Sequence, residues 1–235
     1  MLEISELDGE YERVRADEAI LAAAVEGLRS GVWDGLNITM PLKGEAARLA
    51  DTLSSTAARA GSVNTLGRSG EEISGDSTDA SAFIELLASP RFAERTSVLV
   101  LGNGGSAAAA LAALGNEPNV YVAGRNEEAV DALTMRLGGK RVRWGSTVAG
   151  ALLVNATPIG MLGEKLPEEM LGTVSGLIDL PYGDQETFAV SKARRLGMPF
   201  ADGHEFLLRQ AIAAFARWTG VTVSLETLSE HLRNT

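Results

Sequence analysis

Hydrophobic residues in the middle of the chain form short unbroken runs, and most of these runs stop at a glycine or a polar cluster. The run at 98–101 stops at Gly102, and an alanine-rich segment follows at 106–114. An apolar run without alternation is typical of a strand that is buried on both faces of a parallel sheet. The pattern therefore predicts a strand, a tight glycine turn and a helix in direct succession.

The same alternation of strand and helix continues along the chain. Apolar runs predict further strands at 120–123, 142–144, 152–154, 177–180 and 198–201. Amphipathic segments between them predict helices at 127–137 and 187–196. This order is typical of a doubly wound parallel sheet of the Rossmann type.

The flanking parts of the chain show shorter patterns. Helices are predicted at 17–28, where Asp17 is placed as the cap, and at 43–49, 54–60, 80–87, 205–218 and 225–233. Alternation of polar and apolar residues predicts strands at 11–14, 36–40, 61–66 and 72–74, with a hairpin turn at 67–70. Residues 89–96 are expected to be a linker.

Composition excludes several classes of function. The chain has 235 residues, a formal net charge of −10, no cysteine and two histidines. Disulfides, thiolate metal sites and a cysteine nucleophile are therefore excluded, and we expect no metal. The acidic charge argues against nucleic acid or an anionic membrane as partner, and no apolar run approaches the ~20 residues of a membrane span. We expect a soluble, cytoplasmic protein.

The glycine turn carries the first candidate chemistry. Residues 102–106 are Gly102, Asn103, Gly104, Gly105 and Ser106. Glycines at a strand-to-helix turn let a pyrophosphate approach the free N–H groups and the positive dipole end of the helix. We interpret the turn as a dinucleotide site; the alternative is a tight turn that binds no ligand.

The end of the next predicted strand indicates which dinucleotide is bound. An acid at this position would bond the ribose diol of NAD, whereas a cation would meet the 2′-phosphate of NADP. Arg125 follows this strand, so NADP is favoured and NAD is less expected. The alternative is a surface arginine that pairs with Glu127 or Glu128.

Two further positions combine a polar group with an unusual place in the predicted elements. Lys43 opens a helix, where the dipole disfavours a cation unless something compensates; the alternative reading is a solvated lysine. Asp79 precedes a helix, where its alternative role is that of an N-cap. The segment 155–161, from Asn155 to Met161, follows a buried strand at the sheet edge where open α/β folds bind ligands.

Short motifs occur in this chain in the order in which they occur in one family of dehydrogenases. They are GLNITMPLK, SVNT, GDSTDA, LGNGGSA, GR, NATPIGM, DLPYG and DGHEFLLRQAIAAFARWTG. Over residues 11–235 the chain resembles the shikimate dehydrogenase family.

The resemblance implies a reaction and a domain organisation. The family reduces 3-dehydroshikimate reversibly to shikimate with NADPH, in chorismate and aromatic amino-acid biosynthesis, so we expect a polyhydroxy cyclic acid such as shikimate, quinate or a close analogue as substrate. The expected fold is α/β, with a substrate-binding domain made of residues 1–88 and 205–235. Residues 89–204 are expected to form the NADP-binding Rossmann domain, a doubly wound parallel sheet.

The resemblance also implies residue roles. Lys43 and Asp79 resemble the catalytic pair. Partners of the substrate hydroxyls are expected to be Thr39, Asn64 and Gln210, and Tyr182 resembles a residue near the substrate carboxylate. The expected cofactor contacts are Gly102, Asn103, Gly104, Gly105, Ser106, Arg125, Asn126, Asn155, Thr157, Met161 and Gly203.

The chain departs from the family pattern at its beginning. The family's first strand and the Ser-x-Ser loop that grips the substrate carboxylate have no counterpart, and Ser5 stands alone. Further departures are Ser77 in place of asparagine, Asp184 in place of proline and Ala129 in place of a basic residue. From the missing strand and loop we expect weak substrate binding and an exposed sheet edge that favours a homodimer. The alternative function is a dinucleotide-binding regulatory or assembly protein with a decayed substrate site.

Overall fold

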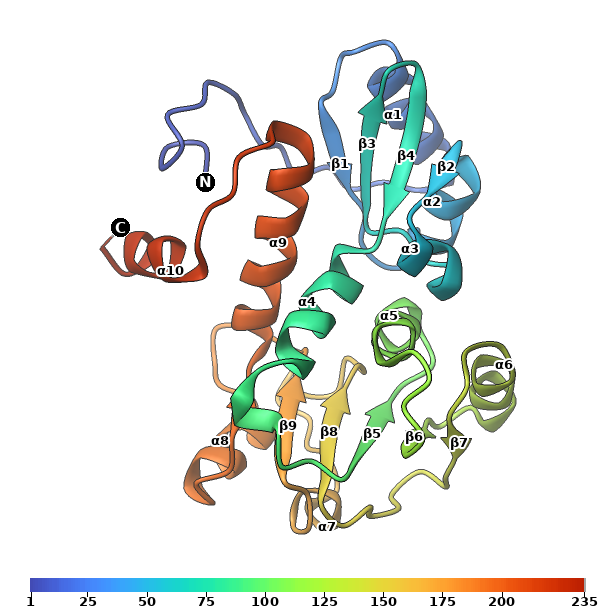
Figure 1. Ribbon diagram of the computed structural model, residues 1–235, viewed down its shortest axis with the longest axis vertical. Coiled ribbons are helices and arrows are strands. Elements are labelled where there is room, and N and C mark those ends of the chain that lie inside the picture. The colour runs from blue at the N-terminus through green and yellow to red at the C-terminus, as the bar shows by residue number, and fades with distance from the viewer. Residues whose placement is uncertain (235) are drawn as a thin grey trace. The chain divides into compact units, whose positions relative to one another are not determined.

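The chain folds into two compact units, which a computed structural model describes over residues 1–234 (Figure 1). The first unit is Met1–Ser81 together with Leu207–Thr235, and the second unit is Ala82–Phe206. From the sequence the corresponding boundaries are expected after residues 88 and 204. No helix in the described part of the chain is long and apolar enough to cross a membrane.

Within the described residues, the second unit contains a six-stranded parallel sheet with the order β10-β9-β8-β5-β6-β7. The strands are β5 (Ser97–Leu101), β6 (Val120–Ala123), β7 (Lys140–Arg141), β8 (Ala151–Asn155), β9 (Gly176–Asp179) and β10 (Phe200–Ala201). The chain winds outward from β5 in both directions, so the strand order reverses between β5 and β8. This is the Rossmann order, and it confirms the predicted doubly wound sheet.

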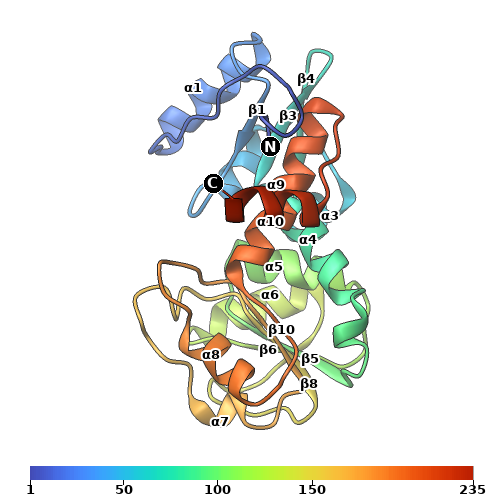
Figure 2. The same ribbon diagram turned by 90° about the vertical axis from the view of Figure 1, so that its left-hand side faces the viewer.

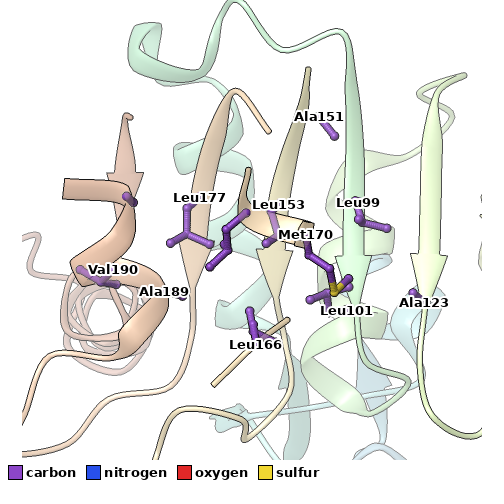
Figure 3. Close-up of a cluster of buried hydrophobic side chains, with 12 residues drawn as sticks. Leu99, Leu101, Ala123, Ala151, Leu153, Leu166, Met170, Leu177, Ala189 and Val190 are labelled. Atoms are coloured by element: carbon purple, nitrogen blue, oxygen red, sulfur yellow. The ribbon is translucent and has the colours of Figure 1, made fainter. Parts of the chain in front are cut away.

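Apolar side chains on both faces of this sheet explain why its strands read as unbroken hydrophobic runs. One face packs against α7 (Glu168–Leu171) and α8 (Phe188–Arg195), with Met170 and Val190 over Leu153 and Leu177 (Figure 3). The other helices of the βα units are α5 (Gly105–Leu114) and α6 (Glu127–Leu137). Most of the alanine side chains of α5 are buried, because small residues let this helix lie close to the sheet.

The first unit is built on a smaller sheet, which in the described residues has four strands in the order β1-β3-β4-β2. Its elements are α1 (Glu18–Arg29), β1 (Gly35–Asn37), α2 (Lys43–Leu49), β2 (Thr52–Leu53), α3 (Ser55–Ala60), β3 (Thr65–Ser69) and β4 (Glu72–Asp76). The cap Asp17 accepts a hydrogen bond from the Ile20 amide, as predicted. Leu21, Val25 and Leu28 bury the apolar face of α1 in a core with Leu66 and Ile73.

Two helices cross the unit boundaries: α4 (Thr78–Leu87) and α9 (Gly203–Thr219). In the first unit, α10 (Leu225–Asn234) lies beside α9 (Figure 2). The first residues of the chain join the apolar cluster of these helices, where Leu2 and Ile4 pack with Phe215 and Leu228. In the second unit, α4 and α9 pack through Phe83 and Phe206, whose ring centroids are 4.7 Å apart. A short 3-10 helix, η1 (Pro90–Phe92), lies in the predicted linker.

Several predicted elements are wrong or displaced. The strands predicted at 36–40 and 61–66 are Gly35–Asn37 and Thr65–Ser69. Residues 11–14 form no strand, because Tyr11 and Val14 are exposed and no described strand pairs with them. The third Rossmann strand is Lys140–Arg141 rather than 142–144. The hairpin turns at residues 70–71 rather than 67–70, since Gly67 is a strand residue that pairs with Gly35 beneath the Trp218 indole.

Candidate active site

Lys43 and Asp79 form an ion pair in the first unit. Lys43 is the first residue of α2, and Asp79 lies in the first turn of α4. The Lys43 Nζ donates to Asp79 Oδ2 at 2.6 Å, and the two side chains are 17% and 7% exposed. The alternative reading of Lys43 as a solvated lysine is therefore wrong. The carboxylate compensates the unfavourable position of the cation at a helix N-terminus.

The reading of Asp79 as an N-cap is also wrong. An N-cap at Asp79 would require the helix to begin after residue 79, but α4 begins at Thr78. The hydroxyl of Ser77 accepts from the Ala80 amide at 3.3 Å instead. Because the Ser77 hydroxyl caps the start of α4, both carboxylate oxygens of Asp79 can accept hydrogen bonds from other side chains.

Asn64 links the ion pair to α9. Its Oδ1 accepts from the Thr78 amide at 2.7 Å, which fixes the side-chain amide. Its Nδ2 lies 2.9 Å from Thr78 Oγ1, 3.1 Å from Asp79 Oδ1 and 3.1 Å from Gln210 Oε1. Two amide protons cannot serve three acceptors fully at the same time. The cluster therefore keeps acceptor capacity for a hydroxyl group of a ligand.

The structure thus brings Lys43, Asn64, Asp79 and Gln210 together, although they are far apart in the sequence. Thr39, in the loop after β1, has an exposed side chain. Chemically, the cluster offers an ammonium group that a carboxylate holds in place, surrounded by amide and hydroxyl groups. Such a set can stabilise charge on a carbonyl oxygen, transfer a proton and recognise hydroxyl groups.

The second unit places the glycine turn at the point where its strand order reverses. Gly102 has φ +117°, and a Cβ built on it would lie 2.8 Å from the Ala156 carbonyl oxygen. Only glycine fits this position without moving the neighbouring loop. Asn103 and Gly104 are exposed, Gly105 and Ser106 partly so, and no side chain caps α5 at Gly104. The N–H groups of this helix start therefore face no internal cap.

Arg125 is exposed and lies two residues after the end of β6. The reading of Arg125 as paired with Glu127 or Glu128 is not realised in the described part of the chain, since Glu127 pairs with Arg141 at 2.8 Å. Asn126 caps α6 by accepting from the Ala129 amide at 3.1 Å, so only its Nδ2 remains for a ligand. Arg125 thus keeps its full donor set at the predicted phosphate position.

The loop after β8 is held by its own first residue. Asn155 Oδ1 accepts from the Thr157 amide at 3.2 Å and from Thr157 Oγ1 at 2.6 Å, and Asn155 Nδ2 donates to the Ile159 carbonyl at 3.1 Å. The Asn155 side chain has no exposed area, whereas Met161, at the far end of the loop, is 48% exposed.

Tyr182 and Gly203, also candidates from the sequence, belong to the second unit. Tyr182 is 43% exposed, and its ring meets the His204 ring edge-on at 5.7 Å. A Cβ on Gly203 would lie 2.4 Å from the Leu180 carbonyl oxygen, so glycine lets α9 begin against the end of β9.

Comparison with known proteins identifies the family. Residues 1–66 match the family model of the shikimate dehydrogenase substrate binding domain. The shikimate dehydrogenase (NADP(+)) of Gluconobacter oxydans is 38% identical over 212 residues, which cover 84% of this chain and 75% of the relative. The chain belongs to the shikimate dehydrogenase family. The enzyme of the same name from Lactococcus lactis subsp. cremoris is 32% identical, with 97% of this chain and 87% of the relative covered.

Solved structures of the shikimate dehydrogenase family agree with this fold. The shikimate 5-dehydrogenase of Thermus thermophilus in complex with shikimate gives a TM-score of 0.87 at 31% identity, covering 99% of this chain and 90% of that one. The same enzyme in complex with NADP(H) and shikimate gives 0.88 at 30% identity, with the same coverage.

Sequence reasoning missed one polar residue of this shikimate dehydrogenase fold. Asp179, the last residue of β9, is fully buried and accepts from Asn155 Nδ2 at 2.7 Å and from Thr187 Oγ1. Burial, the largest cause, and the charge of Asp202 raise the pKa of the Asp179 carboxyl to about 6 against these hydrogen bonds. Its place at the carboxyl end of a strand that leads into DLPYG was the available signal.

Two other features complete the description of the site. Ser5 lies in the turn at the start of the chain, and its buried hydroxyl has no hydrogen-bond partner among the residues that the structure describes. Histidine, cysteine, aspartate and glutamate form no group of three that could hold a metal within residues 1–234.

Proposed function

We propose that this protein is an NADP-dependent oxidoreductase that interconverts 3-dehydroshikimate and shikimate or a close analogue. The observation that carries the proposal is the buried Lys43–Asp79 pair joined to Asn64 and Gln210. Relatives that are 30% identical or more, and similar over most of their length, are named shikimate dehydrogenase (NADP(+)), which supports the proposal.

Lys43 has the central role in the proposed mechanism. When the carbonyl group of the substrate is reduced, negative charge develops on its oxygen, and the Lys43 ammonium stabilises that charge and donates the proton. In the reverse direction Lys43 takes the hydroxyl proton. Asp79 holds Nζ at 2.6 Å, which fixes the position of the donor. NADPH supplies the hydride when it is bound.

The remaining groups of the first unit explain recognition of a polyhydroxy ring. We assign Asn64 and Gln210 to substrate hydroxyls, because their shared contact at 3.1 Å opens to admit a hydroxyl donor or acceptor. Thr39 is assigned as a further hydroxyl donor of the first unit. Tyr182, which belongs to the second unit, stays a proposed donor toward the substrate carboxylate. Amide and hydroxyl recognition rejects analogues that lack a hydroxyl much more strongly than an apolar pocket does.

The residues of the second unit fit a dinucleotide. The turn at Gly102, the uncapped start of α5 and the strand order suit a pyrophosphate at the point where the order reverses. Arg125 suits the 2′-phosphate of NADP, since it is exposed and its neighbour Glu127 is paired with Arg141. Asn103, Ser106, Asn126, Thr157, Met161 and Gly203 stay proposed cofactor contacts, either by side chain or by backbone.

The alternative of a regulatory protein with a decayed substrate site has less support. In a decayed substrate site, selection for activity would no longer keep the two members of the ion pair. Loss of one member would leave the other as an unpaired buried charge, which is costly. Here the Lys43–Asp79 pair and both amide partners are complete. A binding protein without catalysis has no need for them.

Adding shikimate to the protein with NADP⁺ tests the proposal directly. We expect NADPH to form, which absorbance or fluorescence detects, with quinate and NAD⁺ as parallel comparisons. Turnover with shikimate or quinate supports the proposal and names the substrate. Tight NADP⁺ binding without turnover of either acid would favour the regulatory alternative.

A homodimer stays part of the proposal. β1 is an edge strand of the first sheet: it pairs with β3, and no other described strand pairs with it. An unpaired edge is a template for pairing with a second copy. We expect a mass in solution of twice the 24.7 kDa of one chain, and light scattering that gives a single chain would contradict this.

A further inference from the structure

A buried polar network in the second unit joins three elements at the carboxyl end of the sheet. Asn155 and Asp179 are register partners on the neighbouring strands β8 and β9, so their side chains lie on the same face. Thr187 caps α8 through the Val190 amide and donates its hydroxyl proton to Asp179 Oδ2. Each oxygen of Asp179 therefore accepts from a neutral donor.

We propose that Asp179 is a positioning residue for NADP(H): its carboxylate fixes the orientation of the Asn155 amide, and this amide shapes the cofactor loop 156–160. This inference rests on the proposed function. Asn155 does not reach a ligand with its own side chain, because it is fully buried and its donors and acceptor already have partners. Its effect on the cofactor must pass through the loop.

The chemistry of the carboxylate explains why this position holds an acid. An ionised carboxylate only accepts hydrogen bonds, so it favours the orientation in which Asn155 turns its Nδ2 toward Asp179 and its Oδ1 toward Thr157. The Ile159 carbonyl accepts from the same Nδ2 and supports this orientation. A neutral group at position 179 can also donate. Asn155 can then flip, which sets its NH₂ group against the Thr157 amide and its oxygen against the Ile159 carbonyl, so two of the bonds that hold the loop are lost.

The loop in question lies against the glycine turn. The Ala156 amide donates to the Leu101 carbonyl at 2.9 Å, and the Ala156 carbonyl occupies the space beside Gly102 where a Cβ would stand. A change of the loop therefore changes the surface that receives the dinucleotide. This is the physical route from a buried carboxylate to cofactor affinity.

The charged group that acts on Asp179 is Asp202, which follows β10. The last residue of β10, Ala201, pairs with Ile178, so Asp202 continues the register beside Asp179, and its charge raises the pKa of the Asp179 carboxyl. The other groups in contact with Asp179 are neutral: Asn155 from β8 and Thr187 at the start of α8. Protonation of Asp179 near pH 6 is then equivalent to replacing it by asparagine.

The test compares NADPH affinity of the unaltered protein and of Asp179→Asn by fluorescence titration from pH 5 to pH 8. The 2′-phosphate of the cofactor also titrates near pH 6. Because its titration is the same for both proteins, the ratio of their Kd values isolates Asp179. We expect the variant to bind about tenfold more weakly at pH 8, which corresponds to one misoriented hydrogen bond, and equally at pH 5.

Two further variants separate positioning from damage to the fold. Asp202→Asn keeps the cap on the Glu205 amide but removes the charge beside Asp179, so the midpoint of the Kd ratio should move to lower pH. Asp184→Asn, an exposed carboxylate of the same unit, should leave the ratio at one throughout.

Several results would contradict the positioning role of Asp179. A Kd ratio for Asp179→Asn that does not change with pH, or a loss of affinity that accompanies a lowered Tm, would overturn the positioning role. An unaltered protein that fails to bind NADPH at any pH would overturn both this inference and the proposed function. Normal NADPH binding with a ratio of one would overturn this inference alone.

Discussion

At the scale of single residues, the candidate site depends on how each polar group is satisfied. Lys43 is paired with Asp79, Asp79 also accepts from Asn64, and Asn64 contacts Gln210. Each group holds its neighbour in one orientation, which is what a proton donor needs in order to meet a reacting oxygen at the right distance. Charge-assisted bonds in a partly buried setting are stronger than those at the surface.

Replacing either member of the ion pair should remove most of the activity. Lys43→Ala or Asp79→Asn is expected to lower kcat by at least about 10²-fold, because proton transfer and its positioning contribute on that scale. NADPH titration should stay normal. Arg48→Ala, on the exposed side of the same helix, is the matched control and should keep kcat.

The double variant shows whether the two residues work as a unit. Residues that share one function lose little more together than singly. If Lys43→Ala with Asp79→Asn multiplies the two single losses, the groups act independently and the pairing assigned here is wrong.

Arg125 should determine the preference for NADP over NAD. A charge-assisted bond to a phosphate contributes about 1.5 to 3 kcal/mol, so Arg125→Ala should weaken NADPH binding roughly ten- to a hundredfold and leave NADH nearly unchanged. Arg195→Ala, an exposed arginine on α8, serves as control. Equal losses for both cofactors would show that Arg125 does not contact the phosphate.

At the scale of elements, sequence patterns located helices and strands well where a single local signal decided the matter. The helix at 43–49 and the strand at 120–123 have the predicted bounds. In GDSTDA, by contrast, four successive residues 76–79 are all able to cap a helix. The choice of Ser77 depends on Lys43, which lies 36 positions before Asp79 and engages it. Local propensity contains no information about that contact.

The same limit applies to β1 and α9. The residues around Gly35 do not indicate that it lies under an indole. In the structure, Trp218 Nε1 donates to the Leu66 carbonyl at 2.9 Å, and its ring covers β1 and β3. A Cβ on Gly35 would lie 2.1 Å from Trp218 Nε1. Glycine is therefore required for close approach rather than for an unusual backbone angle.

Gly35→Ala should accordingly destabilise the first unit. Displacing Trp218 costs about 1 to 3 kcal/mol, the range of overpacking substitutions, and urea unfolding measures it as a lower midpoint. Gly44→Ala is the matched control, since its Cβ would meet no atom within 4 Å and alanine favours the helix α2. If the Gly35→Ala protein were as stable as the Gly44→Ala protein, the Trp218 indole could not lie against Gly35.

At the scale of the whole molecule, the order of the elements was predictable and the partners of buried polar groups were not. Alternating strands and helices determine the Rossmann strand order almost by themselves, because crossover connections are short and right-handed. The partner of Asn155 is Asp179, 24 residues later on the next strand, and only the register of the folded sheet reveals it. Asn155 was accordingly expected to contact the cofactor itself, whereas its donors and acceptor serve the loop and Asp179.

The pH dependence of unfolding should carry the signature of Asp179. Its native pKa of about 6 lies above the ordinary 3.8. The native state therefore binds more protons than the unfolded state between these values, and stability falls as pH rises through that window. Above about pH 6 Asp179 is ionised in both states, and the full loss of folding stability is present, about 3 kcal/mol for a pKa difference of about two units. Asp51 and Glu164 act in the opposite sense, because hydrogen bonds lower their pKa values and stability is lost as pH falls.

The difference in the free energy of unfolding between the unaltered protein and Asp179→Asn cancels the contribution of these other carboxylates. We expect the variant to be more stable by about 1 to 3 kcal/mol at pH 7.5 and equally stable at pH 4, since asparagine resembles the protonated acid. Urea unfolding at several pH values measures this difference. A variant that is less stable at pH 7.5 would show that the ionised carboxylate stabilises the fold. A more stable variant with weaker NADPH binding means that the acid at this position lowers stability and serves the cofactor loop.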